Sequence, residues 1–569
     1  MLRFLSIALL LLCFSNANAQ PFPFQKGDHV SILGNTLAER MQHHGWMETL
    51  IHSRLPGHEL SFRNLGFSGD ELTLRLRSSG FGSPEDWLKQ TNANVVFAFF
   101  GYNESFAGEE GLPKFEKDLD SFLKETLSKK YDGKNNPRIV LFSPIAHENI
   151  KDPNLPDGIA NNKRIDLYTK AMAKVAAANK VFFVDLFTTT LNLYSVSEKP
   201  LTINGIHLNE FGDKLVAQII EKQLFQNDVQ KNPIFLDKLR ASVLEKDFHW
   251  FNRYRTVDGY SIYGGRADLR FVAGQTNRVV MAREMQILDE ITANRDKKIS
   301  AAANGKVLPN DDSNTAPFLE VVTNKPGPLP GGKHIFLDGK DAISKMTIGK
   351  GLKVELFASE KEFPDLAKPV QMAFDPKGRL WVAVMPSYPH WKPKEEMNDK
   401  ILIFEDTDGD GKADKCKVFA DRLHVPTGLE FWNGGLLVGH QPDLLFLKDT
   451  DGDDVADVRE RVLHGIDSAD THHALSSFAY EPGGGLYFQE GTFHHTQVES
   501  PYGPPRRCAN AGVFRYDPRR QLFDVYASYG FANPHGHAFD RWARQIVTDG
   551  TGAVPYDGAL FSGKLNLPS

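Results

Sequence analysis

Cysteine is scarce in this sequence, which contains three among 569 residues. Cys13 lies in an apolar N-terminal run, so only Cys416 and Cys508 would remain once that run is removed, and at most one disulfide could form. A disulfide-stapled scaffold is therefore excluded. The sequence also lacks a Cys-x-x-Cys-His motif, which excludes covalently attached haem.

A basic excess is absent as well. Asp and Glu number 72 against 66 Lys and Arg, which gives a net charge of −6, so we expect no nucleic-acid partner. Long apolar runs are missing after the N-terminus, and no later segment is predicted to span a membrane. The length exceeds what one hydrophobic core serves, so several domains are expected.

The N-terminus has the pattern of an export signal. Arg3 precedes an apolar run from Phe4 to Phe14, and the Ala-Asn-Ala at 17–19 has the small-x-small form that signal peptidase cleaves. The run is shorter than the roughly 20 residues that span a bilayer, although an uncleaved anchor is the alternative. We predict a signal peptide at 1–19 and an exported protein, periplasmic or extracellular.

Residues 27–226 alternate between apolar strand-like runs and amphipathic helical patterns. The strand-like runs are "HVSILG", "ELSFRNLG", "ANVVFAFFG", "RIVLFSP" and "KVFFVDLF". This alternation predicts an α/β fold with a parallel sheet and helices on both faces, whose functional groups lie at the carboxyl ends of the strands. Residues 230–303 are predicted to form a helical extension, and residues 304–350, rich in Gly, Pro and Asn, a linker.

Residues 351–569 have short strands with frequent Gly and Pro. The segment "DTDGDGKAD" returns as "DTDGDDVAD", and its first aspartates, Asp406 and Asp449, lie 43 positions apart. That spacing matches the roughly 40–50 residues of a four-stranded propeller blade. We predict an all-β propeller of about five blades, and since no closing strand is evident, an incomplete one.

Four segments between 27 and 226 fall at predicted strand ends in an order that resembles the SGNH, or GDSL-like, hydrolase family. The segments are "GNT" at 34–36, "NLGFSGD" at 64–70, "GYNE" at 101–104 and "NGIHLNEFG" at 204–212. The resemblance implies a flavodoxin-like fold and ester hydrolysis. It also implies that Thr36 stands where the family has its nucleophilic serine, and that Asn204 stands where it has the aspartate of Asp-x-x-His.

The remaining family roles follow the same matches. The resemblance assigns His207 as general base and Asn103, with the amide of residue 36, as oxyanion donors, while Gly66 or Gly69 supplies a further amide, with Gly66 preferred. Preorganised donors of this kind stabilise the charge that builds on the carbonyl oxygen. Ser68 and Ser31 are less favoured alternative nucleophiles.

Both altered positions weaken the expected triad. The methyl group of Thr36 restricts χ1 and crowds the line of attack. Asn204 can orient His207 but cannot stabilise its cationic form as a carboxylate would. Two hypotheses therefore remain: the domain is an active esterase, or it is a non-catalytic descendant that binds a ligand.

Two acidic loops of the propeller half carry carboxylates at positions 1, 3, 5 and 9. Alternating carboxylates on a tight Gly-containing loop can converge on a hard cation, and oxygen-only ligands favour calcium. The loops are not EF-hands, since strands flank them and position 12 of the first is Lys417. The predicted structural calcium ligands are Asp406, Asp408, Asp410, Asp414, Asp449, Asp451, Asp453 and Asp457.

Histidines gather between 440 and 537, and they form a second possible site in the propeller. The predicted members are His440, His472, His473, His535 and His537. This half resembles the propellers of sugar and sorbosone dehydrogenases in large exported proteins, which implies sugar oxidation with pyrroloquinoline quinone (PQQ). The leading hypothesis is an exported esterase acting on acylated carbohydrate. The alternatives are a dehydrogenase acting through the propeller and a non-catalytic glycan-binding protein.

Overall fold

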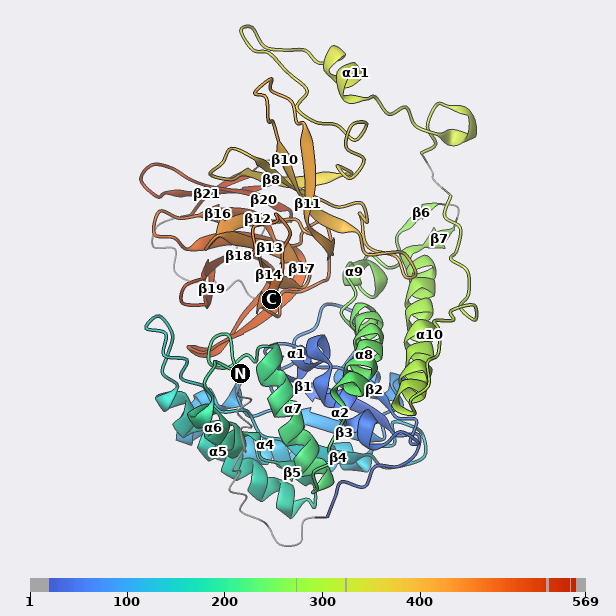
Figure 1. The fold of residues 1–569 in the computed structure, drawn as a ribbon, viewed down its shortest axis with the longest axis vertical. Helices are drawn as coiled ribbons and strands as arrows, with labels where there is room; N and C mark the ends of the chain where they lie inside the picture. The colour runs from blue at the N-terminus through green and yellow to red at the C-terminus, as the bar shows by residue number, and fades with distance from the viewer. Residues whose placement is uncertain (1–19, 273, 323–324, 529–531, 553, 559–569) are drawn as a thin grey trace, which may run out of the picture.

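The computed structural model describes residues 20–272, 274–322, 325–528, 532–552 and 554–558 (Figure 1). The predicted signal peptide lies outside the described residues. None of the helices within these ranges is long and apolar enough to cross a membrane.

A five-stranded parallel sheet forms the centre of the N-terminal part. Its order is β2-β1-β3-β4-β5, with parallel pairing throughout. The strands are β1 (His29–Gly34), β2 (Ser61–Asn64), β3 (Val95–Phe99), β4 (Arg138–Phe142) and β5 (Phe182–Val184). This is the flavodoxin-like order expected of the α/β fold.

Helices cover both faces of this sheet, as its continuous apolar strands require. Alternate residues of β3 supply two different cores, Phe97 one and Val96 the other. The first core contains residues of α1 (Thr36–His44), α2 (Trp46–Arg54) and α7 (Glu210–Phe225). The second contains residues of α3 (Pro84–Gln90), α4 (Gly108–Ser128) and α5 (Ile159–Ala178), and α6 (Leu186–Val196) follows β5.

A helical extension follows the sheet domain. It contains α8 (Pro233–Tyr254), α9 (Gly259–Ile262) and α10 (Asn277–Ala303), with the short strands β6 (Arg270–Val272) and β7 (Gln275–Thr276) between α9 and α10. Helix α8 packs on the hydrolase-like core, where the fully buried Lys246 pairs with Glu48 of α2 at 2.6 Å. The segment after α10 includes α11 (Gly339–Ser344) and runs to the propeller with few buried residues (Figure 1).

The C-terminal part is an all-β, propeller-like arrangement of four antiparallel sheets, which with the parallel sheet confirms the predicted fold class. Blade 1 contains β8 (Pro369–Phe374), β9 (Leu380–Val384), β10 (Asp399–Glu405) and β11 (Lys415–Leu423). Blade 2 contains β12 (Leu429–Trp432), β13 (Gly435–His440), β14 (Asp443–Lys448) and β15 (Val458–Leu463). Blade 3 contains β16 (Ser476–Tyr480), β17 (Leu486–Ser500), β18 (Gly503–Asp517) and β19 (Leu522–Ala527). Blade 4 contains β20 (Pro534–Phe539), β21 (Gln545–Asp549) and β22 (Val554–Gly558).

The expected five blades are four in the described residues, because blades 1 (369–423) and 3 (476–527) each use more chain than the repeat predicts and residues 351–368 supply no blade strand. Strands β17 and β18 have 15 residues each, against five to seven in most other strands of these sheets. Their pairing shifts between Glu490 and His494 and then continues to Ser500 opposite Gly503. The outer part of this hairpin leaves the propeller and reaches the sheet domain (Figure 1).

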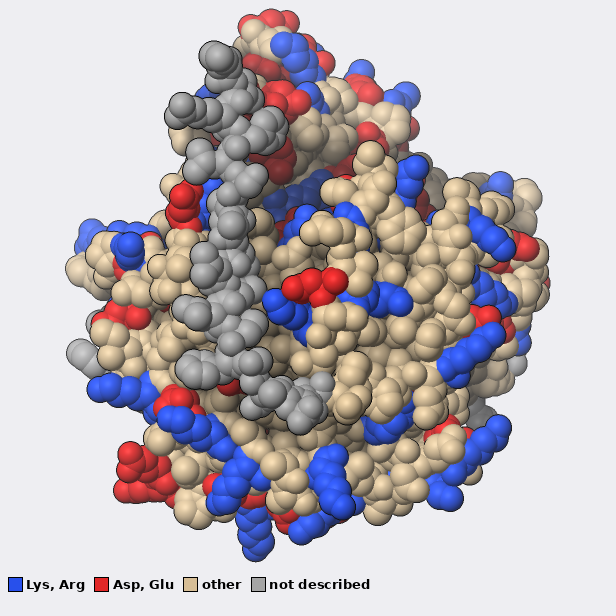
Figure 2. Space-filling model, turned by 60° about the horizontal axis from the view of Figure 1, so that its bottom comes forward, with Lys and Arg blue, Asp and Glu red and all other residues tan. Residues whose placement is uncertain are grey.

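Charged side chains of both signs are interspersed over the face shown in Figure 2. This distribution agrees with the near-balanced composition.

Candidate active site

The site lies at the carboxyl ends of β1 and β3. Gly34 ends β1 at a φ of +148°, and a Cβ there would lie 2.4 Å from the carbonyl oxygen of Phe99, so only glycine fits. The side chain of Asn35 then caps α1 by accepting a hydrogen bond from the amide of Leu37 at 3.2 Å. Thr36 is the first residue of the helix, where backbone N–H groups have no partner within the helix. Its amide is therefore available to a ligand.

Three N–H groups converge on one oxygen atom, Oε1 of Glu499. The donors are the amide of Thr36 at 3.2 Å, the amide of Gly69 at 3.3 Å and Nδ2 of Asn103 at 2.8 Å. Glu499 belongs to β17 of the propeller, so a carboxylate from the other half of the chain fills this donor cluster. The arrangement is that of an oxyanion hole holding an oxyanion.

The preferred oxyanion glycine, Gly66, does not join this cluster. Its amide donates to Oδ1 of Asn64 at 2.8 Å, because the Asn64 side chain closes the turn after β2. Gly69, the alternative predicted from the same segment, takes the position instead, with a φ of +74° that turns its amide toward Glu499. In this structure the contact expected of the Gly66 amide is therefore made by the amide of Gly69.

Asn103 is held in place by its neighbour in the "GYNE" motif. Glu104 accepts hydrogen bonds from the amides of Gly101 and Leu72, both at 2.8 Å, and so pins two loops together around Asn103. Burial raises the pKa of Glu104 to about 7, although these backbone donors oppose the rise. The motif's glutamate therefore acts on the site through the position of Asn103.

His207 and Asn204 lie together, in an orientation opposite to that of a catalytic dyad. Oδ1 of Asn204 accepts from the amides of Ile206 and His207, at 3.2 and 3.0 Å. Its Nδ2 therefore faces Nδ1 of His207, at 3.1 Å, and donates to it. The neutral ring then carries its proton on Nε2, which lies 3.6 Å from Oε2 of Glu499. In this tautomer Nε2 is a donor and cannot act as a base.

The ionisation of the pair follows from its burial. Desolvation lowers the pKa of His207, and the nearby carboxylate of Glu499 offsets this only in part. Desolvation acts on Glu499 in the opposite direction, but His207, Asn103 and the amide of Thr36 together hold the pKa of this carboxyl below its usual range. A carboxylate and a neutral imidazole therefore face each other at neutral pH.

The hydroxyl of Thr36 is fully buried and bonded elsewhere. Its Oγ1 lies 2.7 Å from Oγ of Ser68, which in turn donates to the carbonyl of His464 in the propeller at 3.4 Å. Ser68 thus neighbours the predicted nucleophile, whereas Ser31 bonds to Thr91 inside the sheet and lies away from the cluster. A cavity of about 20 Å³ beside Glu499 and Tyr102 has room for about one water molecule.

Glu499 is the site residue that the sequence did not predict. It stands 463 positions from Thr36, in the segment "QVESPYGPP", which has no motif of its own. Pairing between distant domains leaves no periodic signal in a single sequence. The length of the strand-like segment around it was the one available hint.

The acidic loops bring together part of each predicted calcium set. Carboxylate oxygens of Asp406, Asp408 and Asp414 lie within 4.8 Å of one another, as do those of Asp449, Asp451 and Asp453. Asp410 instead pairs with Lys412 at 3.0 Å, and Asp457 accepts from the amide and hydroxyl of Thr450. Either group could hold a hard cation through oxygen ligands.

The predicted propeller histidines make three sets of contacts. His472 and His473 both contact Asp470, at 3.3 and 2.9 Å, and the ring of His535 lies 6.0 Å from that of His473. His440 accepts from the amide of His424, and His537 packs on Tyr487 and Phe539. A shared site among the five stays a prediction from the sequence. Quinone-dependent sugar oxidation stays a prediction from the sequence.

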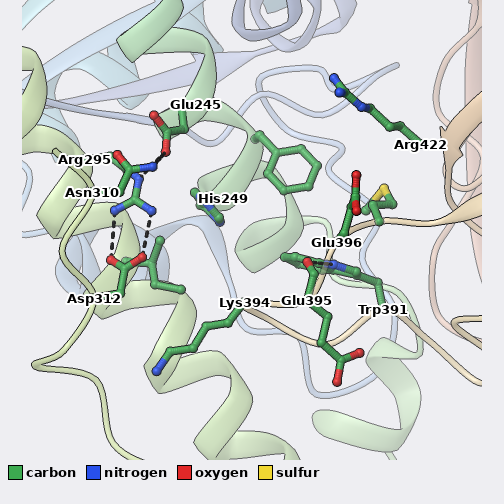
Figure 3. A pocket seen from close by; sticks show the side chains of 13 residues that line it. Glu245, His249, Arg295, Asn310, Asp312, Trp391, Lys394, Glu395, Glu396 and Arg422 are labelled. Atoms are coloured by element: carbon green, nitrogen blue, oxygen red, sulfur yellow. Dashed lines mark hydrogen bonds and ion pairs between the residues drawn. The ribbon is translucent and has the colours of Figure 1, made fainter.

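A wide cleft of about 890 Å³ lies between α8, α10 and the loop before β10 (Figure 3). On one wall Arg295 pairs with Glu245 at 2.7 Å and with Asp312 at 2.8 Å. Trp391 and Glu395 lie on the opposite wall. None of the residues predicted from the sequence lines this cleft, and the charges of its Arg295 wall are already paired.

Comparisons with protein-family models agree with this division of the chain. Residues 33–215 match the GDSL-like Lipase/Acylhydrolase family, and residues 338–558 match a domain of unknown function, DUF7133. The N-terminal part is therefore a GDSL-like acylhydrolase domain, as its sheet and its donor cluster indicate. A search of curated proteins found no match.

Several solved structures are similar to about a third of this chain. One is described as BT4096, a gut microbial diltiazem-metabolizing enzyme, with 19% identity and a TM-score of 0.30 over 36% of this chain and 49% of that chain, so about half of its length is spanned. The acetyl xylan esterase AlAXEase has 24% identity and a TM-score of 0.26, over 34% and 97%. A catalytic mutant of Axe2, an acetylxylan esterase from Geobacillus stearothermophilus, has 15% identity and a TM-score of 0.28, over 37% and 99%. The assignment of residues 33–215 to the GDSL-like acylhydrolases rests on the family match and not on these structural likenesses.

Proposed function

We propose that the protein hydrolyses acyl esters of carbohydrates, and that it does so after export. The carrying observation is the convergence of three N–H groups, from Thr36, Gly69 and Asn103, on one oxygen. Donors fixed in this way stabilise the negative charge of a tetrahedral intermediate without reorganising during the reaction. The carbohydrate substrate and the export are the predictions made from the sequence.

The proposed reaction uses Thr36 as nucleophile. Oγ1 of Thr36 attacks the ester carbonyl carbon while Nε2 of His207 takes the hydroxyl proton, and the carbonyl oxygen becomes an oxyanion held by the three donors. Collapse of the intermediate breaks the bond to the alcohol, which receives the proton from His207. Water then hydrolyses the acyl-threonine by the same steps and releases the acid.

Two changes from the observed structure are required for this reaction. Glu499 must leave the donor cluster, since its Oε1 occupies the place of the oxyanion. The side chain of Asn204 must also turn so that its oxygen accepts from Nδ1 of His207, which frees Nε2 to act as a base. The observed orientation of Asn204 favours a second candidate, a site that binds carboxylates without hydrolysing esters.

The test is hydrolysis of p-nitrophenyl acetate and of acetylated xylan by the wild type, Thr36→Ala and His207→Ala. We expect each variant to lose at least about a hundredfold in rate, since each removes a group that acts in every step. Ser31→Ala is the matched control, because it removes a buried hydroxyl that is bonded to Thr91 outside the cluster. Equal rates in all four proteins, together with no Thr36-dependent hydrolysis by Glu499→Ala, in which the carboxylate no longer fills the donor cluster, would refute the hydrolase proposal.

We also propose that calcium binds the two acidic loops and serves a structural role. The proposal is supported by the convergence of three carboxylates in each loop and by the preference of calcium for oxygen ligands. Calorimetric titration of calcium into the wild type and into Asp408→Asn tests the proposal.

A further inference from the structure

The hairpin of β17 and β18 closes the candidate active site of the same chain. We propose that Glu499 acts as a built-in analogue of the acid product, and that an ester can enter only when this hairpin withdraws. The catalytic consequence of this proposal rests on the hydrolase function proposed above. The occupancy itself rests on the geometry of the hairpin and the donor cluster.

The chemistry of the contact is that of a bound product. An acid product in an ester hydrolase leaves one carboxylate oxygen in the oxyanion hole and the other beside the general base. Glu499 reproduces both contacts, with Oε1 on the three N–H groups and Oε2 at 3.6 Å from Nε2 of His207. A substrate carbonyl carbon would need the position that Cδ of Glu499 holds, so the two cannot bind together.

The hairpin is anchored on each side of Glu499 by separate hydrogen bonds to the hydrolase domain. Before it, Nε2 of Gln497 donates to Asp70 at 2.9 Å. After it, the hydroxyl of Tyr102 donates to the carbonyl of Ser500 at 3.2 Å. Asn161 donates to the next carbonyl, that of Pro501, at 2.9 Å. These bonds hold the hairpin on both sides of Glu499, and so they fix the position of its carboxylate in the donor cluster.

The returning strand adds a charged anchor. Arg507 of β18 donates to the carbonyl of Gly69 at 2.6 Å and pairs with Glu71 at 2.7 Å. Arg507 therefore binds the loop that contains Gly69, whose amide donates to Glu499. A contact of this kind couples the position of the hairpin to the geometry of the donor cluster.

Two glycines allow the close approach of the hairpin. A Cβ on Gly69 would lie 3.1 Å from Cβ of Gln497, and a Cβ on Gly465 would lie 1.9 Å from the carbonyl oxygen of Gln497. Both glycines have a positive φ, +74° and +94°, which other residues rarely adopt. The hydrolase loop and the propeller loop are thus both shaped around this strand.

The closed site leaves no space for a substrate. Thr36 is fully buried, and Glu499 is 5% exposed. The neighbouring cavity of about 20 Å³ holds about one water molecule, which is too little for an acetyl group. The structure therefore corresponds to a blocked state of the hydrolase domain.

The first test of the inference is binding of acetate to Glu499→Ala. Removing the carboxylate leaves the three N–H groups without an acceptor, and acetate is the smallest ligand that restores it. We expect saturating sodium acetate to raise the melting temperature of this variant by roughly 2 °C or more relative to sodium chloride, and to leave the wild type unchanged. Tyr502→Phe is the matched hairpin control, since it removes the hydroxyl bonds to Asn154 and Arg520 but keeps the carboxylate in place.

The second test is hydrolysis of p-nitrophenyl acetate. We expect Glu499→Ala to exceed the wild type by at least about tenfold, and the gain to vanish when Thr36→Ala is added. Glu499→Gln keeps the shape of the side chain, so it serves if the alanine variant does not fold. It should give a smaller gain than Glu499→Ala, because its amide oxygen can still occupy the donor cluster, although it binds the donors less strongly than a carboxylate does.

The outcomes separate the two proposals. Acetate binding to Glu499→Ala without hydrolysis would support the blocked site and refute the hydrolase function. If neither variant gains activity and acetate does not stabilise Glu499→Ala, the inference about the hairpin is overturned. Hydrolysis by the wild type that depends on Thr36 would in that case leave the hydrolase function standing.

Discussion

The substitution Asn204→Asp tests how the site sets the proton on His207. In the wild type, Nδ2 of Asn204 donates to Nδ1 of the ring, so the proton sits on Nε2 and points at Glu499. Aspartate would keep the oxygen that accepts from the amides of Ile206 and His207, and would place a second, charged oxygen against Nδ1. His207 would then lie between two carboxylates.

The magnitude follows from the two distances. A carboxylate oxygen 3.1 Å from the ring would favour the imidazolium by about 5 kcal/mol at an effective dielectric constant of about 20. Proton uptake would also return the cluster to its wild-type net charge of about −1, since one added negative charge is matched by one proton. We therefore expect the ring to be protonated at pH 7 in the variant, where the wild-type ring is neutral because burial lowers its pKa.

The assay is nitrogen NMR of ¹⁵N-histidine-labelled protein, in which the ring nitrogen shifts distinguish the two neutral tautomers from the imidazolium. The sign of the stability change gives a second readout. A raised folded-state pKa adds stability below the unfolded value of about 6.5 that is lost as the pH rises through the folded-state pKa. Asn209→Asp, at the cap of α7, is the control. A His207 that stays neutral at pH 7 in Asn204→Asp would refute the reasoning.

Three further predictions concern other parts of the chain. Lys246→Met should lower the free energy of unfolding by about 3–5 kcal/mol in urea titrations, because it leaves the buried carboxylates of Glu48 and Asp247 without their cation; an unchanged midpoint would contradict this. Calcium binding should be measurable by calorimetry, and Asp408→Asn should weaken calcium binding at its loop at least tenfold. Heats of titration equal to those of a buffer blank would exclude the site. Burial lowers the pKa of His440 to about 4, so its contribution to stability is complete above about pH 6.5 and is lost toward pH 4. Between pH 6.5 and pH 4, the free energy of unfolding of His440→Gln should therefore fall by up to about 3 kcal/mol less than that of the wild type. Parallel plots of unfolding free energy against pH for the two proteins would contradict this.

Much of the hydrolase fold could be predicted because its strands are continuous apolar runs. The five expected runs each contain an observed strand, and the expected strand that ends at residue 187 stops earlier because Asp185 caps α6. Such local signals arise from the backbone period and from capping, which a single sequence carries. Chain order and the family motifs also placed Thr36 and Asn103 after the ends of β1 and β3, whereas His207, expected at a strand end as well, lies in the loop between α6 and α7.

The rest depended on contacts that have no local signature. Gly66 and Gly69 share one loop, and the distinction between them came from the side chain of Asn64, which takes the first amide. The orientation of Asn204 depends on two backbone amides that fix its oxygen. The role of Glu499 depends on a contact across 463 positions. In each case the fold determines which donor reaches a given acceptor, and a single sequence does not contain this information.

The contacts of Arg40 and Arg255 have a consequence for how the two halves can diverge in evolution. Arg40 donates to the carbonyl of Arg461, and Arg255 to that of Ile466, while Arg255 also pairs with Glu39 within the first half. Backbone carbonyls are the same whatever the side chain. The hydrogen bond to the carbonyl of residue 461 should therefore survive substitution there. Position 464, whose ring contacts Arg40 at 2.6 Å, and position 466, whose side chain is fully buried, should vary less.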